Sequence, residues 1–128
     1  WIEAESANLG RCRIPKGLFD QMQTAPVVEI KRSQQERVGQ LVEVYSQHGV
    51  ESLREATLRI SRRLGPQRTL QALEGLNREQ WDQACIAMLD YYDRCYEREL
   101  ARADIKASLD ISGLSTALAA RLLINKSF

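Results

Sequence analysis

The spacing of apolar residues along the chain predicts more helix than strand. Apolar positions recur three and four residues apart in six segments, which is the spacing of one helix face. The segments lie between Pro15 and Pro26, from Ser33 to Gly49, across residues 53–64, from Pro66 through Leu73, from Asn77 toward Leu100, and over Leu118–Ile124. The pattern therefore predicts six helices joined by short connections.

Local signals place several helix ends. Ser33 followed by Glu36 is a capping-box pattern, so a helix is expected to open there. Gly65-Pro66 joins the glycine stop of one helix to the proline start of the next. Asn77 is a candidate N-cap for the longest helix, which we expect to form the spine of the core.

Three further segments have the composition or the alternation of strands: Trp1–Ala4, Pro26–Ile30 and Ile105–Ile111. A polar loop is expected over Ser6–Arg13, where turn residues gather. Two or three strands are few for a parallel sheet, which normally has more neighbours. We therefore predict a helix-rich α/β fold whose remaining strands lie upstream.

Composition changes this picture in one respect. The chain has 128 residues, of which 44% are hydrophobic and 27% charged, as expected for a soluble globular domain. Its 18 basic and 17 acidic residues give a net charge of +1, so any contact with RNA must come from a local patch. The densest basic cluster is a candidate for contacts with an RNA backbone, and its alternative role is a solvated face. It consists of Arg59, Arg62, Arg63 and Arg68.

The cysteines and the apolar runs indicate a cytoplasmic protein. Cys12, Cys85 and Cys95 are odd in number and show no C-x-x-C spacing, which favours a reducing compartment. The longest apolar run, Leu118–Ile124, is far shorter than the roughly 20 residues that span a bilayer, so no membrane contact is expected. The strand-like start without an initiating Met predicts that an upstream segment has been removed.

Candidate chemistry gathers at the first predicted strand, which ends in Glu3-Ala4-Glu5-Ser6. Sheets of this class present ligand sites at the carboxyl ends of their strands, and Mg²⁺ needs only one or two carboxylates beside a phosphate. Glu5 is therefore a candidate Mg²⁺ ligand, although both acids are equally compatible with a solvated strand end. Arg13 follows on the loop, and its guanidinium suits phosphate recognition. No G-x-x-x-x-G-K-[ST] phosphate loop is found.

Two later features have a functional and a structural interpretation. Arg37 lies on a capped helix just after the predicted strand Pro26–Ile30, which is similar to the placement of a lid arginine in P-loop kinases. Tyr91, Tyr92 and Tyr96 offer faces on which bases stack, but aromatic residues at helical spacing are more often part of a core.

In their order and spacing, these segments resemble the part of tRNA 2-selenouridine synthase that follows its P-loop. The segments that carry the resemblance are Trp1-Ile2-Glu3-Ala4-Glu5-Ser6, Leu9-Gly10, Arg13-Ile14-Pro15, Pro26-Val27-Val28-Glu29-Ile30, Glu36-Arg37-Val38, and Tyr91-Tyr92-Asp93 with Tyr96. The resemblance extends to about Leu100. It departs from the family at Ala7, where a basic residue is common, and at Arg94, where Pro is frequent. The departure at Ala7 puts one phosphate contact in doubt.

The resemblance implies the C-terminal part of a P-loop-type parallel sheet domain with an appended helical region. It divides the chain into an α/β half-domain at residues 1–48, a helical subdomain at 49–103 and a strand-helix segment at 104–128. Upstream, it implies a rhodanese-like domain and the Walker loop. The candidate phosphate and substrate residues carried over from the family motifs are Glu3, Glu5, Ser6, Arg13 and Arg37.

The implied activity is a transferase reaction on tRNA that converts 2-thiouridine to 2-selenouridine through a geranylated intermediate. Its implied substrates are geranyl diphosphate and selenophosphate, and the segment alone is expected to be inactive. Two alternatives remain open: a fragment of a small-molecule P-loop kinase, and a helical interaction module without enzymatic activity.

Overall fold

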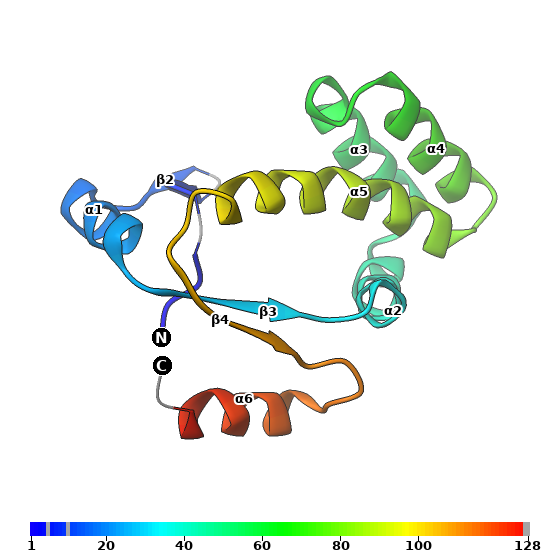
Figure 1. Cartoon of the computed structure of the whole chain (residues 1–128). Coiled ribbons are helices and arrows are strands. Elements are labelled where there is room, and N and C mark those ends of the chain that lie inside the picture. Colours follow the sequence, from blue (N-terminus) through cyan, green and yellow to red (C-terminus); the bar gives the residue numbers. More distant parts are fainter. Residues whose placement is uncertain (5, 10, 127–128) are drawn as a thin grey trace. The chain divides into compact units, whose positions relative to one another are not determined.

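The computed structural model of the protein describes residues 1–4, 6–9 and 11–126. It separates into two compact units: one joins Trp1–Lys31 with Glu99–Phe128, and the other consists of Arg32–Arg98. Figure 1 shows the helices and strands that make up each unit. We call them the strand unit and the helical unit.

The strand unit is built on a pair of parallel strands. Strand β3 (Val27–Lys31) pairs with β4 (Ile105–Asp110) in parallel, and the register runs from Val27 opposite Ile105 to Lys31 opposite Asp110 (Figure 1). The pairing brings together segments that lie more than 70 residues apart in the sequence. The backbone N–H of Ile111 extends the ladder by donating to the carbonyl oxygen of Lys31 at 2.8 Å.

The remaining elements of this unit are short. Strands β1 (Asn8–Leu9) and β2 (Cys12–Arg13) form a small antiparallel hairpin, followed by helix α1 (Lys16–Thr24). Helix α6 (Thr116–Asn125) follows β4, and Ser115 caps its start by accepting a hydrogen bond from the N–H of Leu118.

The helical unit contains four α-helices and one turn of 3-10 helix among its described residues. Helix α2 (Gln34–Tyr45) leads through the 3-10 turn Ser46–His48 to α3 (Val50–Leu64), and α4 (Pro66–Asn77) and α5 (Trp81–Leu100) follow (Figure 1). The chain passes between the two units twice, once between Lys31 and Arg32 and once within α5, which continues for two residues past Arg98.

Small side chains allow the helices of this unit to pack closely. The buried apolar residues include Leu64, Ala72, Ala84 and Ala87, drawn from α3, α4 and α5. Gly75 marks a close approach, because a Cβ atom at this position would lie 2.8 Å from the backbone nitrogen of Ala84. The end of α4 and the start of α5 thus meet at a position where only glycine fits.

Over the residues that it describes, the structure confirms the helix-rich α/β class, the six α-helices and the two strands at β3 and β4. The capping box is also present, since the Oγ atom of Ser33 accepts a hydrogen bond from the N–H of Glu36 at 3.3 Å. Gly65 ends α3 with φ at +85°, a conformation that favours glycine.

Three local predictions are wrong. Trp1–Ala4 is not a strand: its backbone pairs with no described strand, and the side chains of Trp1 and Ile2 are exposed. The predicted loop Ser6–Arg13 contains the β1–β2 hairpin, because the backbone pairs across the turn.

Asn77 ends α4 instead of opening α5, because burial of its neighbours Gly75 and Leu76 extends α4 by one turn. The chain then reverses through Glu79, whose φ of 56° is left-handed.

Candidate functional sites

The predicted phosphate residues are divided between the two units. Glu3, Ser6 and Arg13 belong to the strand unit, and Arg37 belongs to the helical unit. Glu5, the candidate Mg²⁺ ligand, lies outside the described residues. Within the described part of the chain, no group of three or more His, Cys, Asp or Glu residues is arranged to hold a metal ion.

The β1–β2 hairpin presents an exposed arginine. Ser6 donates through Oγ to the carbonyl oxygen of Asn8 at 3.0 Å, and the N–H of Ile14 donates to the carbonyl oxygen of Ala7 at 2.9 Å. These bonds close the hairpin and place Arg13 on β2, opposite Asn8. Arg13 is exposed, so its guanidinium is accessible to an anion.

Arg37 is held by a carboxylate that the sequence did not connect with it. Its Nη1 and Nη2 atoms donate to the two carboxylate oxygens of Asp93, on α5, at 2.6 and 2.8 Å. The side chains of Arg37 and Asp93 are 34% and 32% exposed, and the hydrogen bonds to Asp93 raise the pKa of Arg37. Arg37 thus joins α2 to α5, and a phosphate would have to compete with Asp93 for its guanidinium.

A second ion pair lies one turn away on α5. The Nε atom of Arg68 donates to the carboxylate of Asp90, and Arg94 approaches the same carboxylate at 3.5 Å. The hydrogen bond from Arg68 is the main cause of the lowered pKa of Asp90. Of the four arginines in the predicted RNA-binding cluster, Arg68 is therefore engaged in joining α4 to α5.

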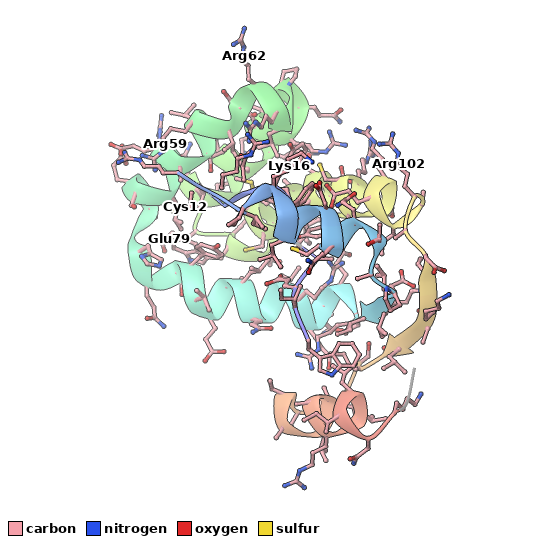
Figure 2. The ribbon with its side chains drawn as sticks, turned by 90° about the vertical axis from the view of Figure 1, so that its left-hand side faces the viewer. Cys12, Lys16, Arg59, Arg62, Glu79 and Arg102 are labelled. Atoms are coloured by element: carbon pink, nitrogen blue, oxygen red, sulfur yellow. The ribbon has the colours of Figure 1, made fainter. Side chains whose placement is uncertain are left out.

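The other three arginines of the cluster are exposed on α3. Arg59, Arg62 and Arg63 form no ion pair with another residue that the structure describes. Figure 2 labels Arg59 and Arg62 and shows the side chain of Arg62 projecting away from the ribbon. The structure thus separates the cluster into one paired arginine and three that face solvent.

A groove lies beside Arg62, where α3 ends and α4 begins. It has a volume of about 460 Å³, and its lining includes Arg62, Pro66, Leu70 and Leu73. The sequence did not predict this groove. The spacing of Leu70 and Leu73 is equally compatible with a helix face that is buried in a core.

The cysteines and tyrosines form no assembled centre among the described residues. Burial raises the pKa of the half-buried Cys85, assisted by the charge of Asp82. A hydrogen bond with Cys95 raises the pKa of Tyr91, which lies edge-on to Tyr92 with 5.3 Å between ring centroids. Tyr91 is half-buried, but Tyr92 and Tyr96 are 45% and 46% exposed, so the aromatic segment, contrary to expectation, is not part of a core.

The described residues define a helix-rich α/β protein that combines a small parallel sheet with an arginine-rich helical unit. None of its described helices has both the length and the apolar character needed to cross a membrane. Residues 1–57 match the family model described as the tRNA 2-selenouridine synthase AAA domain. No curated protein and no solved structure matches the chain.

The match supports the resemblance over the N-terminal part of the chain. It includes the positions of Glu3, Ser6, Arg13 and Arg37, and it ends two residues before Arg59. The resemblance of the later segment around Tyr91-Tyr92-Asp93 stays a prediction.

Proposed function

We propose that the chain is part of a tRNA-modifying transferase that replaces the sulfur of 2-thiouridine with selenium. The match of residues 1–57 to the synthase family carries this proposal. The reaction proceeds through a geranylated intermediate, with geranyl diphosphate and selenophosphate as substrates. The rhodanese-like and Walker-loop regions of the same protein would supply the groups that this chain lacks.

In this proposal, the strand unit contributes to a phosphate site. Glu3, Glu5, Ser6 and Arg13 would form one part of it, with Glu5 as the Mg²⁺ ligand. The exposure of Arg13 on a hydrogen-bonded hairpin supports this role. Arg37 would join the site only when an anion displaces Asp93, so Arg13 is the sharper test.

Replacing Arg13 by Gln in the complete protein should lower the rate of 2-selenouridine formation about tenfold or more, because a charge-assisted contact with phosphate is lost. The measurement is single-turnover conversion of a 2-thiouridine tRNA, followed by nucleoside chromatography. Arg11→Gln is the matched control, since Arg11 is also exposed on the hairpin but outside the Arg-Ile-Pro motif. Equal rates in the two variants would remove Arg13 from the site.

The helical unit would provide a platform for tRNA. The exposed arginines on α3 support this role, because arginine binds phosphate through a planar fork of donors. Sequence-independent contacts of this kind weaken with added salt.

Charge reversal at Arg62 and Arg63 should weaken tRNA binding and lower the slope of log affinity against log salt by about 2. Fluorescence anisotropy across a salt series measures both quantities. The matched control reverses Arg78 and Arg98, which are exposed on α4's C-cap and on α5. If both double variants change the salt slope equally, tRNA binding depends on the net charge of the protein and α3 is not a specific platform.

The P-loop kinase fragment and the helical interaction module remain as alternatives, and no observation favours either of them over the synthase. Failure of the complete protein to modify tRNA, together with transfer of phosphate to a small molecule, would favour the kinase.

A further inference from the structure

Positive charge in the helical unit is concentrated in one segment. Residues 32–98 contain ten arginines, no lysine and ten acidic residues. Four of the arginines lie within residues 56–73, where there is no Asp or Glu. The rest of the unit therefore has six arginines against ten acids. We call residues 56–73, the end of α3 and the first two turns of α4, the basic corner.

The basic corner combines this charge with exposed apolar surface. Arg59, Arg62 and Arg63 are exposed, and Arg62 also lines the groove of about 460 Å³. Leu70, on the groove wall, is 59% exposed. The groove thus places exposed apolar surface beside Arg62, a combination that a ligand with an apolar part and a negative charge can use.

The groove offers little for the recognition of a particular base. The Oγ1 atom of Thr69 already donates to the carbonyl oxygen of Gly65 at 2.7 Å. Pro66 has no backbone N–H to donate. Ser61 adds one hydroxyl to the lining, and the rest is mainly aliphatic, through Pro66, Leu70 and Leu73. A ligand would therefore be held by apolar contact in the groove and by charge at its rim.

We infer that the basic corner binds a single-stranded segment of RNA, with one unpaired base lying in the groove against Leu70 and the flanking phosphates on the α3 arginines. This inference rests on the proposed tRNA platform and specifies its ligand. The base is held without regard to its identity, because the groove presents apolar surface and few free donors. A fully paired duplex has no base to place there.

The size of the groove favours RNA over an acidic peptide as the occupant. The planar fork of arginine binds phosphate and carboxylate alike, so the exposed arginines call for an anionic ligand without choosing between the two. The groove is open to solvent and short, and its apolar lining at the end of α3 and the start of α4 offers a face for one base. An acidic amphipathic helix would need a longer apolar track than the short groove provides.

The test uses the complete protein and three fluorescent probes: single-stranded oligouridylate, an RNA duplex of equal length, and an amphipathic peptide rich in Leu and Glu. Leu70→Ser should weaken oligouridylate binding about fivefold to tenfold, leave its salt slope unchanged, and leave duplex binding unchanged. Leu58→Ser is the matched control, because Leu58 is an exposed leucine of the basic corner that does not line the groove. It should change each affinity by less than about twofold.

Thermal melting checks that both variants fold. We expect both to fold, because Leu58 and Leu70 are exposed in the unaltered protein. NMR provides a second measurement on the unaltered protein: oligouridylate should shift the methyl signals of Leu70 and Leu73 more than those of Leu58. Unchanged oligouridylate binding in Leu70→Ser, or an equal loss for the duplex, overturns the inference.

The outcomes also separate this inference from the proposed function. If charge reversal of Arg62 and Arg63 weakens tRNA binding but Leu70→Ser has no effect, the platform stands and the base-binding groove falls. If only the acidic peptide binds, and Leu70→Ser abolishes that binding, both fall and the basic corner is a protein-docking surface.

Discussion

At the scale of single residues, two carboxylates on α5 bind arginines from other helices of the helical unit. Asp93 binds Arg37 from α2, and Asp90 binds Arg68 from α4. Each pair joins residues at least 22 positions apart in the sequence. Arginines chosen from the sequence as candidates for phosphate binding are thus partly used to fix helices to one another.

The Asp90 pair predicts a specific dependence of stability on pH. The hydrogen bond from Arg68 lowers the pKa of Asp90 in the folded state below its ordinary value of 3.8. The folded state therefore binds fewer protons than the unfolded state in this range. The contribution to stability is present above the unfolded pKa and is lost as the pH falls through the folded pKa.

Asp90→Asn should remove this component, so its unfolding free energy should fall less steeply on acidification from about pH 5 than that of the unaltered protein. Urea titrations at a series of pH values measure the difference. Glu97→Gln, an exposed change further along α5, is the control. Parallel pH profiles for Asp90→Asn and the unaltered protein would show that the pair does not contribute to folding.

At the scale of elements, the contact between α4 and the start of α5 depends on a missing side chain. A Cβ atom at Gly75 would lie 2.8 Å from the nitrogen and 3.2 Å from the Cα of Ala84. These are backbone atoms, which cannot move aside as a flexible side chain can. Glycine in mid-helix normally lowers stability, so its presence here reflects the close approach of the two helices.

Gly75→Ala should lower the free energy of unfolding of the helical unit. Overpacking is expected to cost about 1–3 kcal/mol, and the higher helix propensity of alanine offsets about 1 kcal/mol of that cost. Chemical denaturation measures the change. Gly39→Ala in α2 is the matched control, since beyond its chain neighbours and the adjacent backbone of its own helix no atom lies within 4 Å of its added Cβ. It should stabilise the protein by up to about 1 kcal/mol. Stabilisation by both changes would show that α4 and α5 are further apart than described.

At the scale of the whole molecule, one unit is continuous in sequence and the other is not. The helical unit is formed by Arg32–Arg98 alone, whereas the strand unit needs segments from both sides of it. Strand β3 pairs with β4, and the whole helical unit lies between these two strands in the sequence. The two units should therefore differ in their ability to fold as fragments.

A fragment of residues 32–98 should retain most of its helix and melt cooperatively, because its core lies within one stretch of chain. A fragment of residues 1–31 should be largely unfolded, since its strand lacks a partner and a single strand cannot satisfy its backbone hydrogen bonds. Circular dichroism and thermal melting of the two fragments test this. A helical fragment that melts without cooperativity would contradict the assignment of a continuous core.

The elements that could be predicted from the sequence are the ones that local interactions determine. The helices after Pro15 and Ser33, and the break at Gly65-Pro66, were predictable because caps, prolines and apolar spacing act within a few residues. The strand expected at Trp1–Ala4 was not formed, because a strand depends on a neighbour that its own residues do not specify.

By itself, the sequence determined the helix-rich α/β class, most element positions and the resemblance that the match over residues 1–57 supports. Only the tertiary structure decided the pairing of β3 with β4, the binding of Arg37 to Asp93, and the separation of Arg68 from the exposed arginines. The physical reason is distance along the chain. Propensity and capping act between near neighbours, whereas these pairings join residues that approach one another only when the helices and strands pack.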